Sequence, residues 1–154
     1  MRAAIRPATA DDCARIAAIA HAAYVGYVSR IGGAPAPMLA DFAAEIAAGR
    51  AVVIEDAGAV AGYMIAWAEP DAYFIDSVAV EPARQGRRLG RALIAHAAAT
   101  ARRLGLPAVR LYTNVAMTEN LALYARLGFV ETHRASEDGF ERVYLRCDLL
   151  DGAA

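Results

Sequence analysis

Apolar residues recur at helical spacing near the start of the chain. Thr9 and Asp11 offer side-chain oxygens that can cap a helix, and the apolar positions that follow fall on one helical face. These positions are Ile16, Ile19, Ala20, Ala23 and Tyr24. The pattern predicts a first amphipathic helix.

A Gly/Pro-rich segment, residues 32–37, then interrupts the helical pattern. The pattern resumes at residues 38–39, includes Phe42 and ends at Gly49, a residue type that suits the end of a helix. We therefore expect a loop between two helices.

Three strand-like runs follow. Residues 51–54 and 60–67 are rich in β-branched and aromatic side chains, and residues 56–58 (Asp-Ala-Gly) suit a tight turn between them. A third run, residues 73–80, ends before Pro82, which cannot donate to a sheet ladder. The pattern predicts an antiparallel meander of three strands.

The second half of the chain continues with a helix and a strand. Residues 89–104 have a strong helical pattern that Gly105 and Pro107 close, and residues 109–113 have the character of a strand. Strand, helix and strand in this order predict a right-handed βαβ crossover.

The remaining residues predict a short helix and two strands. The helix covers residues 120–127, and the strands cover residues 129–133 and 143–149 around a turn at 137–139. Cys147 shares one face of the last strand with apolar residues, so we expect it in the core. The whole pattern indicates an α/β (α+β) protein with a mixed sheet flanked by helices.

The composition excludes several classes of protein. The chain has 154 residues, of which 58% are hydrophobic and 21% charged, so it is too apolar for disorder and is expected to form one domain over residues 1–154. No apolar stretch approaches the roughly 18 residues of a membrane span. The formal net charge of -1 gives no reason to expect nucleic acid as a partner.

Cysteine and histidine give no sign of a metal site. Cys13 and Cys147 lie far apart, which suits a reducing compartment, and His21, His96 and His133 are scattered. We therefore expect a cytoplasmic protein without a metal cofactor.

The most informative stretch, residues 78–93, joins a buried strand to a helix through a turn with glycines and arginines. Backbone N–H groups at a helix start have no partner within the helix, so they can bind an anion such as a phosphate. The arginines around this turn are Arg84, Arg87, Arg88 and Arg91. An ordinary helix start whose arginines serve solubility is the alternative interpretation.

This turn resembles the signature of the GNAT superfamily, the acetyl-CoA-dependent N-acetyltransferases. The signature is Gln/Arg-x-x-Gly-x-Gly/Ala after an apolar strand, and residues 85–90 (Gln-Gly-Arg-Arg-Leu-Gly) match its first and last positions. Arg88 replaces the usual middle glycine, so we expect a negative φ there.

A second match lies in residues 120–129, which are similar to the family's Leu-Tyr-x-x-x-Gly-Phe helix. The family often has an asparagine seven residues before the tyrosine, Tyr124, whereas this chain has Met117 there, with Asn114 and Asn120 nearby. Both motifs occur in the order and spacing typical of the family.

The resemblance covers roughly residues 4–148, and its specific part is residues 75–129. It implies a GNAT-type, mostly antiparallel sheet with a βαβ crossover that binds CoA. It also implies that backbone amides around residues 87–91 hold the pyrophosphate and that residues 78–80 pair with the pantetheine arm. The residues that it assigns to acetyl-CoA are Val78, Ala79, Val80, Gln85, Gly86, Arg87, Arg88, Leu89, Gly90, Arg91 and Asn120.

The resemblance places the Tyr124 hydroxyl beside the CoA sulfur, where it would act as a general acid. Packing of a half-buried helical tyrosine is the alternative role. A backbone N–H of residues 78–80 is the expected donor to the reacting carbonyl oxygen.

Asp76 is the candidate base. Strict alternation would put it on the same strand face as Phe74, Val78 and Val80, near the acceptor amine. A strand aspartate that only accepts hydrogen bonds, or one that orients a cationic substrate, is the alternative. The candidate residues for the acceptor pocket surround the Gly/Pro-rich segment and are Tyr24, Tyr27, Ile31 and Met38.

We expect an N-acetyltransferase that moves an acetyl group from acetyl-CoA directly to a primary amine of a small molecule or peptide. A non-catalytic module that binds CoA or senses acyl-CoA is the alternative. A nucleotide-binding domain is less consistent with this chain, which has neither a GxGxxG nor a Walker A motif. The family resemblance leaves a homodimer open.

Overall fold

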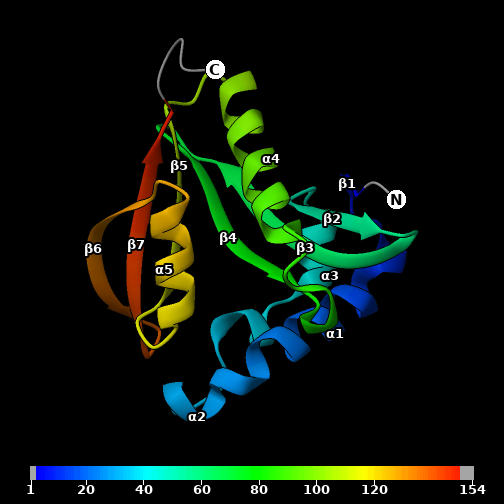
Figure 1. Ribbon diagram of the computed structural model, residues 1–154, viewed down its shortest axis with the longest axis horizontal. Coiled ribbons are helices and arrows are strands. Elements are labelled where there is room, and N and C mark those ends of the chain that lie inside the picture. Colours follow the sequence, from blue (N-terminus) through cyan, green and yellow to red (C-terminus); the bar gives the residue numbers. More distant parts are fainter. Residues whose placement is uncertain (1–2, 150–154) are drawn as a thin grey trace.

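The computed structural model describes residues 3–149 and contains one seven-stranded sheet with helices on both faces (Figure 1). The strands are β1 (Ala4–Pro7), β2 (Ala51–Asp56), β3 (Ala59–Ala68), β4 (Tyr73–Val80), β5 (Ala108–Asn114), β6 (Val130–Glu137) and β7 (Phe140–Asp148). The helices are α1 (Cys13–Tyr24), α2 (Val28–Ile31), α3 (Phe42–Ala47), α4 (Leu89–Arg103) and α5 (Thr118–Arg126). Short 3₁₀ turns are η1 (Ala10–Asp12), η2 (Val25–Tyr27), η3 (Ala36–Leu39) and η4 (Pro82–Arg84).

The sheet order is β1-β2-β3-β4-β5-β7-β6, and every neighbouring pair is antiparallel except β4 and β5. The predicted meander of β2, β3 and β4 is therefore confirmed. So is the crossover, because α4 connects the parallel strands β4 and β5. The fold is the mixed, mostly antiparallel α/β architecture that the sequence predicts.

The parallel pair β4–β5 separates along its length. Tyr73–Ile75 of β4 pair with Val109–Leu111 of β5, and no later residue of either strand continues this pairing. Figure 1 shows the two strands together at one end and apart at the other. The separation leaves an opening in the sheet beside residues 76–80.

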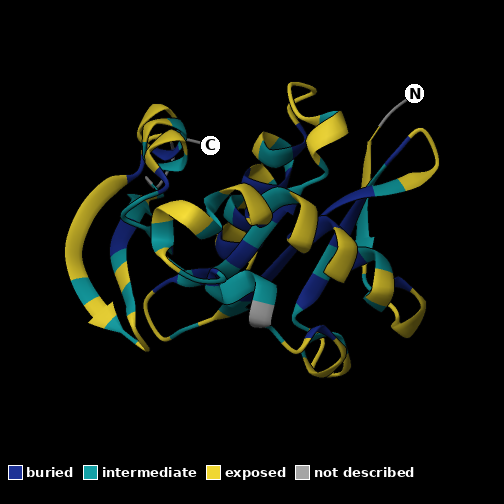
Figure 2. Ribbon diagram, turned by 90° about the horizontal axis from the view of Figure 1, so that it is seen from below, coloured by how far each residue is buried: buried dark blue, intermediate teal, exposed yellow. Residues whose placement is uncertain are grey.

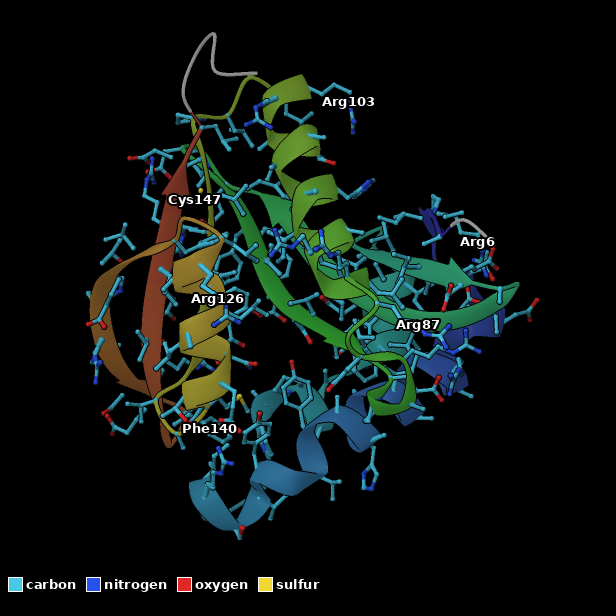
Figure 3. All side chains as sticks on the ribbon, in the orientation of Figure 1. Arg6, Arg87, Arg103, Arg126, Phe140 and Cys147 are labelled. Atoms are coloured by element: carbon cyan, nitrogen blue, oxygen red, sulfur yellow. The ribbon has the colours of Figure 1, made fainter. Side chains whose placement is uncertain are left out.

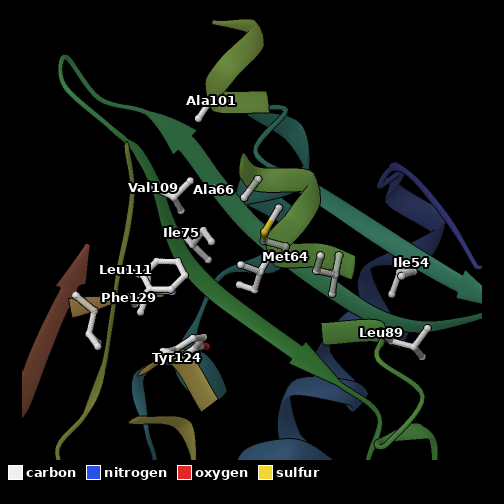
Figure 4. Packing of buried hydrophobic residues seen from close by; sticks show 14 of the residues in the cluster. Ile54, Met64, Ala66, Ile75, Leu89, Ala101, Val109, Leu111, Tyr124 and Phe129 are labelled. Atoms are coloured by element: carbon white, nitrogen blue, oxygen red, sulfur yellow. The ribbon is translucent and has the colours of Figure 1, made fainter. Parts of the chain in front are cut away.

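Two apolar clusters hold the helices to the sheet. One lies under α4 and α5 and includes Met64, Ile75 and Leu93, each at most 1% exposed (Figure 4). The other lies under α1 and α3 and includes Ile16 and Tyr63, both fully buried. Figure 2 shows that burial is concentrated in the central strands, whereas β6 is exposed along most of its length.

Close packing requires a glycine in β3. A Cβ on Gly62 would lie 2.8 Å from the Ala79 carbonyl oxygen, closer than such atoms approach. The glycine therefore lets β3 and β4 pair without a local shift.

The structure corrects the predicted elements or adds to them in three places. Strand β1 was not predicted, because its four residues alternate too briefly to give a signal. Residues 38–39 belong to η3 rather than to the second helix, which begins at Phe42 with the Asp41 carboxylate accepting from Ala44 N–H. In addition, β7 lies between β5 and β6, an order that chain sequence alone does not show.

Candidate active site

The opening between β4 and β5 exposes backbone groups of β4. Glu81 N–H donates to the Ala61 carbonyl, so by antiparallel alternation Ala79 also bonds to β3, whereas Val78 and Val80 point the other way. Two contacts support this direction. The Tyr24 hydroxyl donates to the Val78 carbonyl at 2.9 Å, and Gln85 Nε2 donates to the Val80 carbonyl at 3.4 Å.

The N–H groups of Val78 and Val80 therefore face the opening. Ala79, predicted with them, lines the same groove, but its own N–H is directed toward β3. Of the three predicted residues of this strand, only the two valines can offer an amide to a ligand.

The turn into α4 contains a run of backbone N–H groups without hydrogen-bond partners among the described residues. The Ala92 N–H is bonded to the Arg88 carbonyl, whereas the N–H groups of residues 86–91 have no backbone acceptor within residues 3–149. Because α4 has 15 residues, its dipole adds partial positive charge at the same place. This arrangement is a cradle for an anion.

The cradle depends on two residues with positive φ. Gly86 has φ of 86° and Arg88 has φ of 62°, so both adopt the left-handed region. The prediction of a negative φ at Arg88 is wrong: the arginine keeps the conformation that glycine would favour, although a side chain is disfavoured there by about 1 kcal/mol. The turn therefore keeps its backbone conformation although Arg88 stands where the family signature has glycine.

The four arginines of the turn divide into two pairs. Arg84 and Arg87 contact the buried carboxylate of Asp56, at 3.3 and 3.1 Å, and so fasten the turn to the β2–β3 hairpin. Arg88 and Arg91 line the groove beside the cradle. Arg87 was predicted at the cofactor, but its guanidinium is on Asp56 and outside the residues that line the groove.

A groove of about 620 Å³ runs from this turn to α5, and we call it the α4 groove. It includes all the other predicted cofactor residues, with Asn120 and Tyr124 from α5 and Tyr24 and Tyr27 from the α1 side. It also includes Arg126, which the sequence analysis missed. Figure 3 shows the Arg126 side chain extending from α5 toward the gap that separates it from β4 and α4.

Tyr124 lies at the inner end of the α4 groove. Its ring packs edge-on against Phe129, with centroids 5.8 Å apart, and the residue is 8% exposed. Its hydroxyl forms no hydrogen bond with any of residues 3–149. Every fully buried side-chain oxygen of these residues does have a partner, so the Tyr124 hydroxyl is not fully buried and a ligand can reach it. Burial raises the pKa of Tyr124 to about 12, so the phenol stays protonated and can donate.

Asp76 sits in a β-bulge. Ile65 of β3 is opposite Ser77 and Ala66 is opposite Ile75, so Asp76 is the extra residue. The bulge breaks strict alternation: Val78 and Val80 pack with the cluster under α4, whereas Ser77 bonds Tyr63 of the opposite cluster. The prediction that Asp76 shares a face with Val78 and Val80 is therefore wrong.

The bulge directs Asp76 to a polar place between strands. The Tyr112 hydroxyl donates to Asp76 Oδ1 at 3.4 Å. Burial raises the pKa of Asp76 and the negative charge of Glu45 raises it further, whereas the Tyr112 hydrogen bond and Arg142 lower it. The net effect is a carboxyl group with a raised pKa.

A second, smaller hollow of about 40 Å³ surrounds Asp76, and we call it the Asp76 hollow. Its walls come from β4, β5, β7, α5 and the Pro35–Pro37 segment. Of the predicted acceptor residues only Tyr24 reaches it, whereas Tyr27 lines the α4 groove. Ile31 and Met38 line neither space and pack instead against the cluster under α1.

The two spaces meet. Four residues line both of them: Tyr24, Val78, Asn120 and Tyr124. The free Val78 amide and the free Tyr124 hydroxyl are thus at the junction of an anion-binding groove and a polar hollow.

A comparison with protein-family models finds the acetyltransferase (GNAT) family over residues 18–129. The chain belongs to this family. GNAT proteins are acyltransferases, so this chain is an acyltransferase of the GNAT type, as its motifs predict. No curated protein was found that matches the chain.

Solved GNAT structures share the fold over nearly the whole chain. The PaiA N-acetyltransferase of Thermoplasma acidophilum, solved in complex with coenzyme A, has a TM-score of 0.79 at 13% identity, covering 97% of this chain and 100% of that one. Ard1 of Thermoplasma volcanium has a TM-score of 0.75 at 20% identity, covering 97% and 99%. The ribosomal-protein-S18-alanine N-acetyltransferase of Escherichia coli has a TM-score of 0.75 at 20% identity, covering 99% of both chains. At these identities the likeness establishes the GNAT fold.

Within residues 3–149 of this GNAT protein, no group of three or more histidine, cysteine, aspartate or glutamate side chains is arranged to hold a metal ion. None of the helices there is long and apolar enough to cross a membrane.

Proposed function

We propose that the protein transfers an acetyl group from acetyl-CoA to a primary amine, directly, while both substrates are bound. The observation that carries this proposal is the junction of the two spaces at Val78 and Tyr124. A thioester in the α4 groove and an amine in the Asp76 hollow would meet there without an acyl-enzyme step.

The α4 groove suits acetyl-CoA. The amides of residues 86–91 and the start of α4 can hold the pyrophosphate, and Arg88, Arg91 and Arg126 add positive charge along the groove. The outward N–H of Val80 can donate to a carbonyl of the pantetheine arm, as in a strand pairing. The groove volume of about 620 Å³ also fits a ligand of this size class.

Each proton and bond of the reaction has a candidate. Acetyl-CoA supplies the activated acyl carbon: the new C–N bond forms as the C–S bond breaks. The Val78 N–H can donate to the acyl oxygen as negative charge develops on it. The Tyr124 hydroxyl can protonate the departing sulfur, because its raised pKa keeps the proton in place until then.

Asp76 is the proposed acceptor of the amine proton, directly or through one water. A raised pKa makes a carboxylate a stronger base, and the position in the hollow suits this role. The reaction also needs a compartment that contains acetyl-CoA, and the two free cysteines favour a reducing one such as the cytoplasm.

The test is thiol release from acetyl-CoA with a panel of amines, read with a thiol reagent and by mass spectrometry of the product. We expect release that depends on both enzyme and amine, with one acetylated amine formed per thiol. Tight CoA binding without amine-dependent release would contradict the proposal and leave a non-catalytic CoA-binding module.

A further inference from the structure

The Asp76 hollow carries both signs of charge. Among the described residues that line it, Asp76 and Arg142 are the two with a formal charge, and the others are apolar, aromatic or neutral. Asp76 comes from the bulge of β4, and Arg142 comes from β7 on the other side of the opening. In a space this small, each charge acts on whatever molecule enters.

Arg142 lies over two aromatic rings. Its guanidinium carbon lies 4.4 Å from the centroid of Tyr112 and 5.9 Å from that of Phe140. Figure 3 labels Phe140 at the end of β7 that faces the segment carrying η3. Stacking on a ring fixes the guanidinium plane and leaves its N–H edge free to form hydrogen bonds.

Most of the Arg142 donors are not used by the described residues. Arg142 has five N–H groups. Among residues 3–149, one of them forms a hydrogen bond: Nη1 donates to Glu137 Oε1 at 3.3 Å. The side chain is 15% exposed, and no fully buried side-chain nitrogen of the described residues lacks a partner. The remaining donors are therefore not fully buried, and Arg142 is one of the residues that line the hollow.

Arg142 and Asp76 do not neutralise each other by contact. No nitrogen–oxygen distance of 4.0 Å or less joins them among the ion pairs of residues 3–149. Tyr112 stands between the two charges, with its hydroxyl on Asp76 and its ring under Arg142. The hollow thus offers one site for a positive or hydrogen-bond-donating group and a separate site for a negative group.

We propose that the acceptor is a small amino acid, whose carboxylate binds the Arg142 guanidinium while its amine lies between Asp76 and the junction at Val78 and Tyr124. This inference rests on the proposed acetyl transfer and adds the class of acceptor. A guanidinium and a carboxylate match in charge and in planar geometry. A hollow of about 40 Å³ favours a short acceptor, with the two functional groups only a few bonds apart.

Other acceptors would fit this pair of charges less well. A polyamine would bring a second positive charge toward Arg142, and a simple alkylamine would add no anionic partner to the Glu137 carboxylate that the guanidinium already contacts. The N-terminus of a peptide has an amide where a free amino acid has its carboxylate, so it would lose the charge-assisted hydrogen bond.

The experiment compares free amino acids with their carboxamides, which keep the amine and side chain but lack the negative charge. The panel contains small α- and ω-amino acids, the matched carboxamides, a short peptide, an alkylamine and a polyamine. For the preferred amino acid we expect kcat/KM at least about 10-fold above that of its carboxamide, because a charged hydrogen bond contributes about 1.5–3 kcal/mol. The advantage should lie mainly in KM.

Two variants test whether Arg142 causes the preference for the free amino acid over its carboxamide. Arg142→Gln should reduce the ratio of kcat/KM for acid over carboxamide to about 1, and Arg142→Lys should restore part of it. Arg146→Gln is the matched control, because Arg146 lies on the same strand outside the hollow and pairs with Asp148. It should keep the wild-type ratio. Unfolding midpoints of the three variants identify any general loss of structure.

The outcomes separate the two proposals. Wild-type enzyme that prefers carboxamides, peptides, alkylamines or polyamines would overturn the amino-acid acceptor and keep acetyl transfer. An acid-over-carboxamide ratio unchanged by Arg142→Gln in a folded protein would also overturn it. Absence of thiol release with every amine would instead reject the proposed function.

Discussion

At the scale of single residues, the account rests on which polar groups are free and which are already engaged. The Val78 N–H and the Tyr124 hydroxyl are free at the junction, whereas Arg84 and Arg87 are bound to Asp56. Sequence motifs single out Tyr124, which lines the α4 groove. They could not show the engagement of Arg87, because Asp56 lies 31 residues away in the chain.

Two other residues show what local pattern cannot predict. Arg126 lines the α4 groove, but it lies two residues after Tyr124 and six after Asn120, the residues of α5 that the motifs single out, so helical spacing from them did not indicate it. Arg88 gave no signal either. Its positive φ is imposed by the turn, which overrides the usual preference of a residue with a side chain.

Tyr124→Phe separates catalysis from packing. The change keeps the ring and its contact with Phe129 and removes only the hydroxyl, which bonds to no described residue. The unfolding midpoint and the dissociation constant for CoA should therefore stay close to wild type. The turnover number should fall by roughly 10- to 1,000-fold if the hydroxyl protonates the leaving sulfur.

The matched control is Tyr73→Phe, which removes a tyrosine hydroxyl outside both spaces and should leave turnover near the wild-type value. A folded Tyr124→Phe protein with full activity would show that the Tyr124 hydroxyl has no catalytic role and that the residue serves packing.

At the scale of elements, α1, α3, α4 and α5 and the central strands were predictable from their hydrophobic periods and from the glycines and prolines between them. The position of Asp76 was not. A bulge in β4 depends on pairing with β3, so it shifts Asp76 away from the alternation that the sequence alone suggests. The separation of β4 from β5 is likewise a property of the pair rather than of either strand.

A single substitution, at Gly90, can test the role of the start of α4. A Cβ on Gly90 would meet only Val80 Cγ2, at an ordinary 3.8 Å, so the fold should tolerate a side chain. Gly90→Asp would place a carboxylate in the anion cradle, and we expect the affinity for CoA to fall at least about 10-fold through charge repulsion. Calorimetric titration with CoA measures the change.

Gly90→Asn is the control for this variant, because it has nearly the same shape without the negative charge. It should bind CoA more tightly than Gly90→Asp, with both proteins unfolding near the wild-type temperature. Equal, undiminished binding by a folded Gly90→Asp protein would remove the cradle from the CoA site.

At the scale of the whole molecule, the fold brings together two spaces that no single motif describes. The α4 groove belongs to the crossover β4-α4-β5, which the sequence motifs located. The Asp76 hollow combines β4, β5, β7 and the Pro35–Pro37 segment, which are brought together only by the sheet order. The predicted cofactor residues other than Arg87 line the α4 groove, whereas of the four predicted acceptor residues only Tyr24 reaches the hollow.

The central claim is that acetyl donor and amine are bound together where these spaces meet. Initial rates of thiol release, measured while acetyl-CoA and the amine are both varied, test it most directly. Our account predicts double-reciprocal lines that intersect, as expected for a ternary complex. Parallel lines, with an acetylated enzyme formed in the absence of amine, would contradict it.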